Sequence, residues 1–180
     1  NERKKPFLLQ KKINIKKIEK KIDFEISKNQ NFIEYSEIGL IYLKNIFKII
    51  KKNTGGILII DYGFTDGKMK NTLQSVSNHK FANILENIGN VDITHKINFK
   101  LFENFAKKIG GLTNILTTQK KFLINMGIKQ RAEIISRNES FLKKADIYYR
   151  LNRLIDEKQM GNLFKVMFIK NKNNNFKQGF

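Results

Sequence analysis

With 180 residues and no cysteine, the chain can build one hydrophobic core but no disulfide bond and no thiolate metal site. Hydrophobic residues make up 41% of it and include 15 phenylalanines, which excludes disorder over most of the length. The formal net charge is +19, but only five of the 35 basic residues are arginine. We therefore attribute the charge mainly to compositional drift, and expect weak, salt-sensitive binding to polyanions.

The first 34 residues form a basic, irregular segment. Short apolar pairs lie among lysines, and their spacing changes midway from alternating to helical. We expect a half-exposed strand and then a short helix; an amphipathic helix on a membrane surface is the alternative. No apolar run in the chain approaches the roughly 20 residues that span a bilayer, so a cytoplasmic bacterial protein is expected. The chain starts at Asn1 and not at methionine, which favours a piece of something longer.

A helix and a buried strand come next. Apolar residues recur at helical spacing over residues 36–52, and a glycine pair ends this pattern. The run "ILIIDYG" (57–63) is typical of a parallel strand that is covered on both faces. Helix, short turn and buried strand are the half-unit of a doubly wound α/β sheet, whose ligands lie beyond the carboxyl ends of the strands. Asp61 and Tyr62 occupy that end.

The rest of the chain alternates between loops and further elements. Residues 64–97 show little periodicity, and loops of this length inside a domain are usually functional. The later predictions are, in order, a helix over 98–109 with Asn98 as its N-cap, two strand-compatible halves over 114–127 around Gln119, two helices within 128–157, a strand over 163–169 and a disordered tail over 171–180. The domain proper is expected to span residues 35–170.

Five segments of this sequence together resemble one family. They are "GGILIIDYG", "NTLQSVSNHKF", "GNVDITHKINF", "TTQKKFLINMGIKQRA" and "MGNLFKVM". In this order, over about residues 33–168, they resemble the C-terminal half of the MidA-type S-adenosylmethionine-dependent methyltransferases. The mitochondrial member of that family methylates an arginine in respiratory complex I assembly.

The resemblance implies an α/β fold, the Rossmann-like sheet of class I methyltransferases with its last strand antiparallel. Residues 57–63 would be its fifth strand, 114–124 its sixth and 163–169 its seventh. The implied cofactor is S-adenosyl-L-methionine. The family binds it at a glycine turn that follows the first strand, whereas Gly55 and Gly56 precede a strand.

We therefore expect the cofactor-binding half to lie before Asn1, with no cofactor-binding residue and no metal site in this chain. The fragment alone is expected to be inactive. Its fifth strand would lack the fourth strand as a neighbour, which leaves an apolar edge that favours aggregation.

The candidate substrate-binding residues are Asp61, Tyr62, His79, Asp92 and His95, and no catalytic residue is assigned. Asp61 either orients a guanidinium by paired hydrogen bonds or only caps backbone amides at the strand end. Tyr62 either packs under the loop or presents its hydroxyl to a pocket. The family tends to show a histidine where His79 lies. Asp92 and His95 lie in "VDITHKINF", with the histidine one place earlier than in the family pattern Asp-x-Thr-x-His.

The sequence thus predicts the C-terminal fragment of a methyltransferase whose substrate is a protein arginine, with a respiratory complex I subunit as the partner. The alternative is a freestanding basic module that binds nucleic acid or an anionic surface.

Overall fold

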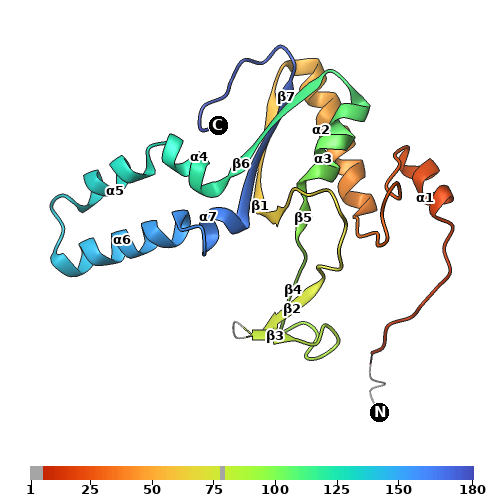
Figure 1. The fold of residues 1–180 in the computed structure, drawn as a ribbon, viewed down its shortest axis with the longest axis horizontal. Helices are drawn as coiled ribbons and strands as arrows, with labels where there is room; N and C mark the ends of the chain where they lie inside the picture. The colour runs from red at the N-terminus through yellow and green to blue at the C-terminus, as the bar shows by residue number, and fades with distance from the viewer. Residues whose placement is uncertain (1–5, 78–79) are drawn as a thin grey trace. The chain divides into compact units, whose positions relative to one another are not determined.

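The computed structural model describes residues 6–77 and 80–180, which form two compact units (Figure 1). One unit combines Asn1–Ile38 with Lys68–Lys96, and the other combines Gly39–Gly67 with Ile97–Phe180. His79 lies outside the described residues. The domain boundaries that the sequence suggests at residues 34 and 170 stay predictions.

A four-stranded mixed sheet forms the centre of the second unit. Its order is β5-β1-β7-β6, in which β7 runs antiparallel to both neighbours and β5 pairs parallel with β1. The strands are β1 (Gly56–Phe64), β5 (Ile97–Asn98), β6 (Leu112–Thr118) and β7 (Phe164–Asn171). The last strand of the chain therefore lies between the predicted fifth and sixth strands and opposite to them in direction. This arrangement agrees with the predicted class I methyltransferase fold.

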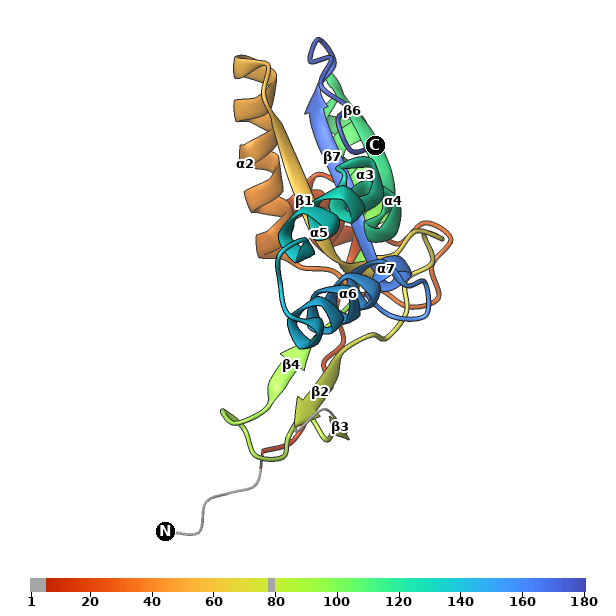
Figure 2. The ribbon, with the colours of Figure 1, turned by 90° about the vertical axis from the view of Figure 1, so that its left-hand side faces the viewer.

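Two helices cover one face of this sheet, α2 (Glu37–Asn53) and α3 (Phe99–Ile109) (Figures 1 and 2). Phe47 and Phe105 are buried where these helices meet, with 6.0 Å between their ring centroids. The Asn98 side chain accepts the backbone N–H of Leu101 at 3.1 Å, so it is the N-cap of α3 as predicted.

The opposite face of the sheet is covered only in part. Phe168 of β7 is buried there beneath the rings of Phe176 and Phe180, at centroid distances of 5.6 and 6.0 Å. These two rings belong to the tail for which the sequence predicts disorder. On β1, Leu58 and Ile60 remain 46% and 48% exposed. The prediction that β1 is covered on both faces is thus wrong for this chain, because the tail covers β7 and leaves β1 open.

One edge of β1 is also largely unpaired. Its pairing with β5 involves Gly63 and Phe64, which lie opposite Ile97 and Asn98. Among the described residues, Gly56–Tyr62 has a strand partner only on the β7 side. The predicted apolar edge is therefore present.

The connection between β6 and β7 is helical, which corrects the predicted sixth strand. The Thr118 hydroxyl accepts the backbone N–H of Lys121 at 3.3 Å and starts a helix, so the strand ends at residue 118 and not at 124. The buried Gln119 ties this first helix to the third, since its Nε2 donates to the carbonyl oxygen of Leu154 at 2.9 Å. The four helices are α4 (Gln119–Asn125), α5 (Ile128–Ser136), α6 (Phe141–Ile155) and α7 (Met160–Leu163).

The first unit holds a short helix and a small antiparallel sheet of order β3-β2-β4. Its elements are α1 (Ile15–Ile22), β2 (Gln74–Ser77), β3 (Lys80–Ala82) and β4 (Asp92–Thr94). The long loop predicted over 64–97 therefore contains strands, which are too short to produce a recognisable alternation in the sequence. The strand expected before α1 does not occur within residues 6–34.

Carboxylates tie together the chain segments of the first unit. Glu19 Oε1 accepts the backbone N–H groups of Ile26 and Ser27, each at 2.8 Å, and the bonds from Ser27 are the main cause that lowers the pKa of Glu19. Glu34 accepts both the backbone N–H of Thr72, at 3.2 Å, and its hydroxyl, at 2.5 Å.

None of the helices among the described residues has the length and apolar character needed to cross a bilayer.

Replacing Gly63 by alanine should weaken the pairing of β1 with β5. A Cβ at this position would lie 2.2 Å from the carbonyl oxygen of Ile97, so the backbone has to shift. We expect Gly63→Ala to lower the free energy of unfolding by about 1–3 kcal/mol in a urea titration. Gly55→Ala is the control, because a Cβ there has no atom within 4 Å. Equal losses in the two variants would contradict this account of β5.

Candidate functional site

The carboxyl end of β1 carries the two candidates that the sequence places there, and both side chains are half-buried. Asp61 Oδ1 accepts the backbone N–H of Tyr62 at 2.7 Å, whereas Oδ2 accepts no hydrogen bond from the described residues. The Tyr62 ring packs edge-on against Phe164 of β7, with 5.6 Å between centroids. Asp61 therefore caps the backbone amide of Tyr62, shortly before the strand ends at Phe64, and keeps one oxygen available, and Tyr62 has a packing role.

A row of three polar side chains crosses the sheet at this end. Asp61 of β1, Lys165 of β7 and Thr118 of β6 are cross-strand partners and so share one face. Burial lowers the pKa of Lys165, and its ammonium group donates to the carbonyl oxygen of Asn162. Lys165 is not among the candidate residues that the sequence suggests. The signal for it is a single lysine within a strand that is otherwise apolar from Phe164 to Ile169.

Asp92 and His95 belong to the other unit. Both side chains are exposed, and neither has a hydrogen-bond partner among the described residues. Between them, the Thr94 hydroxyl accepts Gln74 Nε2 at 3.1 Å, across the β2–β4 pair. Thr94 thus has a structural role in this motif, because it joins β4 to β2. Substrate binding by Asp92 and His95 stays a prediction, as does any role of His79.

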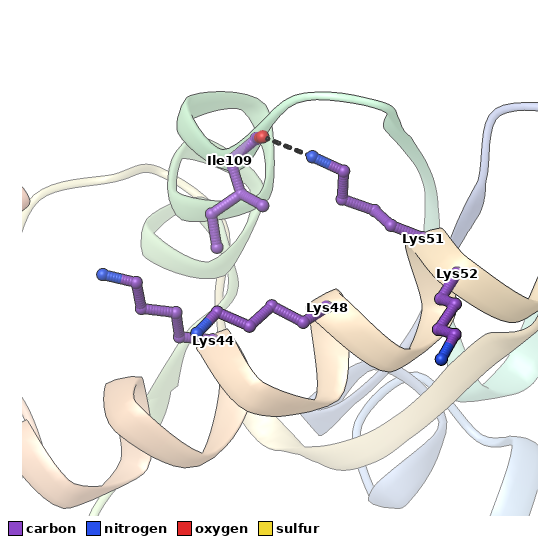
Figure 3. A pocket seen from close by; sticks show the side chains of 5 residues that line it. All are labelled: Lys44, Lys48, Lys51, Lys52 and Ile109. Atoms are coloured by element: carbon purple, nitrogen blue, oxygen red, sulfur yellow. Dashed lines mark hydrogen bonds between the residues drawn. The ribbon is translucent and has the colours of Figure 1, made fainter.

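A lysine-rich pocket lies beside the last turns of α2 and α3 (Figure 3). Its volume is about 470 Å³, and its lining consists of Lys44, Lys48, Lys51, Lys52 and Ile109. Lys51 Nζ donates to the carbonyl oxygen of Ile109 at 3.2 Å, and Lys52 points the other way (Figure 3). The lysines suit the negative ends of the two helix dipoles. No arginine and no aromatic side chain lines this pocket, which favours diffuse attraction of anions over specific recognition.

Glycines near the sheet serve packing, and they do not form a cofactor cradle. A Cβ on Gly56 would lie 2.6 Å from the Phe168 ring, and a Cβ on Gly63 would collide with the β5 backbone. Neither glycine lies in a turn between a strand and a following helix, where backbone amides would face a ligand. These two glycines therefore do not form the turn with which the family binds S-adenosylmethionine. The described residues also contain no cluster of three or more His, Asp or Glu side chains able to hold a metal ion.

Residues 4–118 match a family model described as "Putative S-adenosyl-L-methionine-dependent methyltransferase". The chain belongs to this methyltransferase family. The resemblance inferred from the five sequence segments is thus confirmed. The helices α4–α7 lie outside the matched residues.

Curated relatives of the chain are mitochondrial protein arginine methyltransferases named NDUFAF7. The Danio rerio protein is 29% identical over 139 residues, which are 76% of this chain and 32% of that protein. The Homo sapiens protein is 28% identical over 127 residues, which are 69% of this chain and 28% of that protein. The chain therefore spans about a third of the length of these relatives.

Two solved structures from Burkholderia thailandensis share the fold. One is an uncharacterized protein with a TM-score of 0.62 and 25% identity, matched over 77% of this chain and 39% of its own. The other belongs to the same superfamily and holds S-adenosyl-homocysteine, with a TM-score of 0.62 and 24% identity over 81% of this chain and 39% of its own. These similarities agree with the sheet order described above for the second unit.

Substitutions at Asp61 should separate its capping role from its charge. Asp61→Asn keeps an oxygen that accepts the Tyr62 N–H, so its free energy of unfolding should stay close to wild type. Asp61→Ala removes that acceptor and should cost about 1 kcal/mol in a urea titration. Asp92→Ala, at an exposed carboxylate without a partner among the described residues, is the control and should change little. A large loss in Asp61→Asn would contradict the capping role.

Proposed function

We propose that this chain is the C-terminal part of an S-adenosyl-L-methionine-dependent methyltransferase that methylates an arginine of a protein. The observation that carries this proposal is the position of β7, antiparallel between β1 and β6, in a chain of this family. The arginine is proposed from the similarity to the NDUFAF7 arginine methyltransferases. A subunit of respiratory complex I is the substrate we propose within that class.

The open side of β1 supports the idea that another segment completes the fold. The unpaired edge of Gly56–Tyr62 offers backbone N–H and C=O groups to a further strand. Leu58 and Ile60, each about half exposed on the same strand, offer an apolar surface to whatever covers that strand. A segment that supplies a fourth strand and its helices would satisfy both features. Such a segment would also bring the glycine turn that the described residues lack.

Asp61 is the residue that we propose to face the substrate. Its Oδ2 is without a hydrogen bond from the described residues, at the strand end where ligands lie in sheets of this kind. A carboxylate there can accept N–H groups of a guanidinium, which fixes the orientation of the planar group. The cofactor supplies an activated methyl group, and this chain contributes to positioning its acceptor.

The alternative is a basic module that binds nucleic acid or an anionic surface, and its surface would be the pocket of Lys44, Lys48, Lys51 and Lys52. One of these four lysines is already bonded to the end of α3. A surface of this kind binds any polyanion weakly, and the binding falls steeply with salt. We therefore rank this function second.

The proposal predicts that the chain alone does not bind the cofactor. Isothermal titration with S-adenosylmethionine, and separately with S-adenosylhomocysteine, should give no heat above dilution at millimolar ligand, because the described residues lack the glycine turn. The Burkholderia thailandensis protein whose crystal structure holds S-adenosyl-homocysteine is the positive control for that ligand. Saturable binding to the 180-residue chain would contradict the placement of its strands.

Activity is tested on the longest product of the reading frame that contains this chain. DNA upstream of Asn1 should encode, in frame, a strand followed by a G-x-G turn. That product, incubated with methyl-labelled S-adenosylmethionine and protein extract from a strain lacking the gene, should form methylarginine that amino-acid analysis detects. Asp61→Ala should lower its turnover about 10- to 100-fold with cofactor affinity unchanged, whereas Tyr42→Ala on exposed α2 should not. An intact start codon directly before Asn1, or label on other residues alone, would refute the proposal.

A further inference from the structure

The helices α5 and α6 form a hairpin, which we call the arm (residues 128–155), and it extends away from the sheet of its unit (Figure 1). The two helices pack through small side chains, with Ala132 and Ser136 each 4% exposed. The base of the arm is tied to α4 by the hydrogen bond from Gln119 to the Leu154 carbonyl, and by an ion pair between Lys120 and Glu157 at 2.7 Å. The arm is thus a fixed element of the unit.

The outer face of the arm is apolar and aromatic. No residue of α6 is buried, although many of its 15 residues are apolar. Phe141 is 83% exposed, Leu142 78% and Tyr149 69%, and Tyr148 is 45% exposed. Phe141 and Tyr148, and likewise Leu142 and Tyr149, lie seven residues apart, so each pair lies along one side of α6 and the two sides adjoin. The Tyr148 hydroxyl accepts Ser136 Oγ of α5 at 3.5 Å, whereas Phe141, Leu142 and Tyr149 form the exposed apolar stripe. Large apolar side chains gathered on one exposed side of a helix mark an interaction surface.

The cations of the arm are of an unusual kind for this protein. The arm holds four of the five arginines in the chain, which are Arg131, Arg137, Arg150 and Arg153. Elsewhere the chain uses lysine almost exclusively. Arginine and tyrosine are the residue types most enriched at the energetic centres of protein interfaces, whereas lysine is depleted there. The arm therefore differs in chemistry from the lysine surface of the rest of the chain.

The charge of the arm indicates the sign of its partner. The arm carries seven basic and three acidic residues. Two of those acids are already paired within it, Glu139 with Lys143 at 3.1 Å and Asp146 with Arg150 at 2.8 Å. Arg131, Arg137 and Arg153 have no carboxylate partner among the described residues. A second copy would bring the same positive charge against this face and be repelled, whereas a partner with carboxylates would pair with the free guanidinium groups.

We propose that the arm is a docking surface for a protein segment that presents an apolar helix face bordered by aspartate and glutamate. Phe141, Leu142 and Tyr149 are its apolar anchors, and Arg131 and Arg153 pair with the acids of the partner. An anionic membrane shares the attraction to positive charge. We disfavour a membrane because the arm is enriched in arginine and tyrosine, which suit pairing with carboxylates of a protein, and not in the lysine that is abundant elsewhere in the chain. The proposal stands apart from methyl transfer and from the residues matched by the family model, which end before α4.

The test is a titration of the 180-residue chain against fluorescent designed helical peptides, read by anisotropy. One peptide of about 18 residues carries leucine at positions i, i+3, i+4 and i+7, bordered by glutamate; its twin has glutamine in place of every glutamate. We expect the glutamate peptide to bind at least tenfold more tightly than the glutamine peptide. Arg131→Gln with Arg153→Gln should abolish that difference, and Phe141→Ser with Tyr149→Ser should weaken both peptides at least tenfold.

Matched controls lie on α2. Lys48→Gln with Lys52→Gln removes the same charge, and Tyr42→Ser with Ile49→Ser removes side chains that are 66% and 60% exposed. Urea titration of every variant should give wild-type stability. The proposal is overturned if the α2 variants lose as much affinity as the arm variants, or if the two peptides bind equally.

Other occupants of the arm are separated by three further measurements. Sedimentation equilibrium should show that the chain's self-association is the same in wild type and in Phe141→Ser with Tyr149→Ser. Co-sedimentation with vesicles of phosphatidylcholine and phosphatidylserine should likewise be unaffected by that pair. A longer product of the same reading frame should bind the glutamate peptide as this chain does. If the Phe141→Ser, Tyr149→Ser pair reduces self-association, the occupant is a second copy, and if it reduces vesicle binding, the occupant is a membrane. If the longer product does not bind the peptide, the occupant is a further segment of the same protein. Each of these results would overturn the proposal.

Discussion

The ladder between β1 and β7 is the interaction on which the rest of the second unit depends. It pairs seven residues of each strand in register, from Gly56 with Lys170 to Tyr62 with Phe164. β7 is the last strand among the described residues, so residues more than a hundred positions apart must meet before the sheet exists. Closing so long a loop costs conformational entropy. That cost is offset by apolar burial on β7, where Val166, Met167 and Ile169 are fully buried.

This ladder also decides what each face of the sheet can do. Residues that lie opposite each other across it share a face, so Asp61 meets Lys165 at the carboxyl end of β1, while Leu58 meets Phe168 nearer its start. The tail rings cover Phe168 and leave Leu58 and Ile60 half exposed. The register of β1 against β7 therefore places the proposed substrate-facing carboxylate, Asp61, on one face and the proposed assembly surface, Leu58 and Ile60, on the other. A slip of β1 by one residue would move each of these side chains to the opposite face.

The connection from β6 to β7 through α4–α7 has a different character. An antiparallel pair needs only a two-residue turn, yet this chain places four helices there. Their arginines and exposed aromatic rings lie beyond the residues that match the family model. The proposed docking of an acidic partner involves these helices, whereas the proposed methyl transfer rests on the residues that match the family model.

The sequence by itself determined the strongly periodic elements, which are α2, α3, β1 and β7, because each carries a long apolar pattern and clear end signals such as Asn98. It also placed Asp61 and Tyr62 at a strand end. Only the tertiary structure decided that Tyr62 packs on Phe164, that Lys165 lies opposite Asp61, and that a helix begins at Gln119. Those facts depend on cross-strand register, on a side-chain cap and on a buried amide, and local spacing along the chain carries none of them. The exposed β1 face is likewise a tertiary result, since an apolar run looks the same whether one face of it is covered or both.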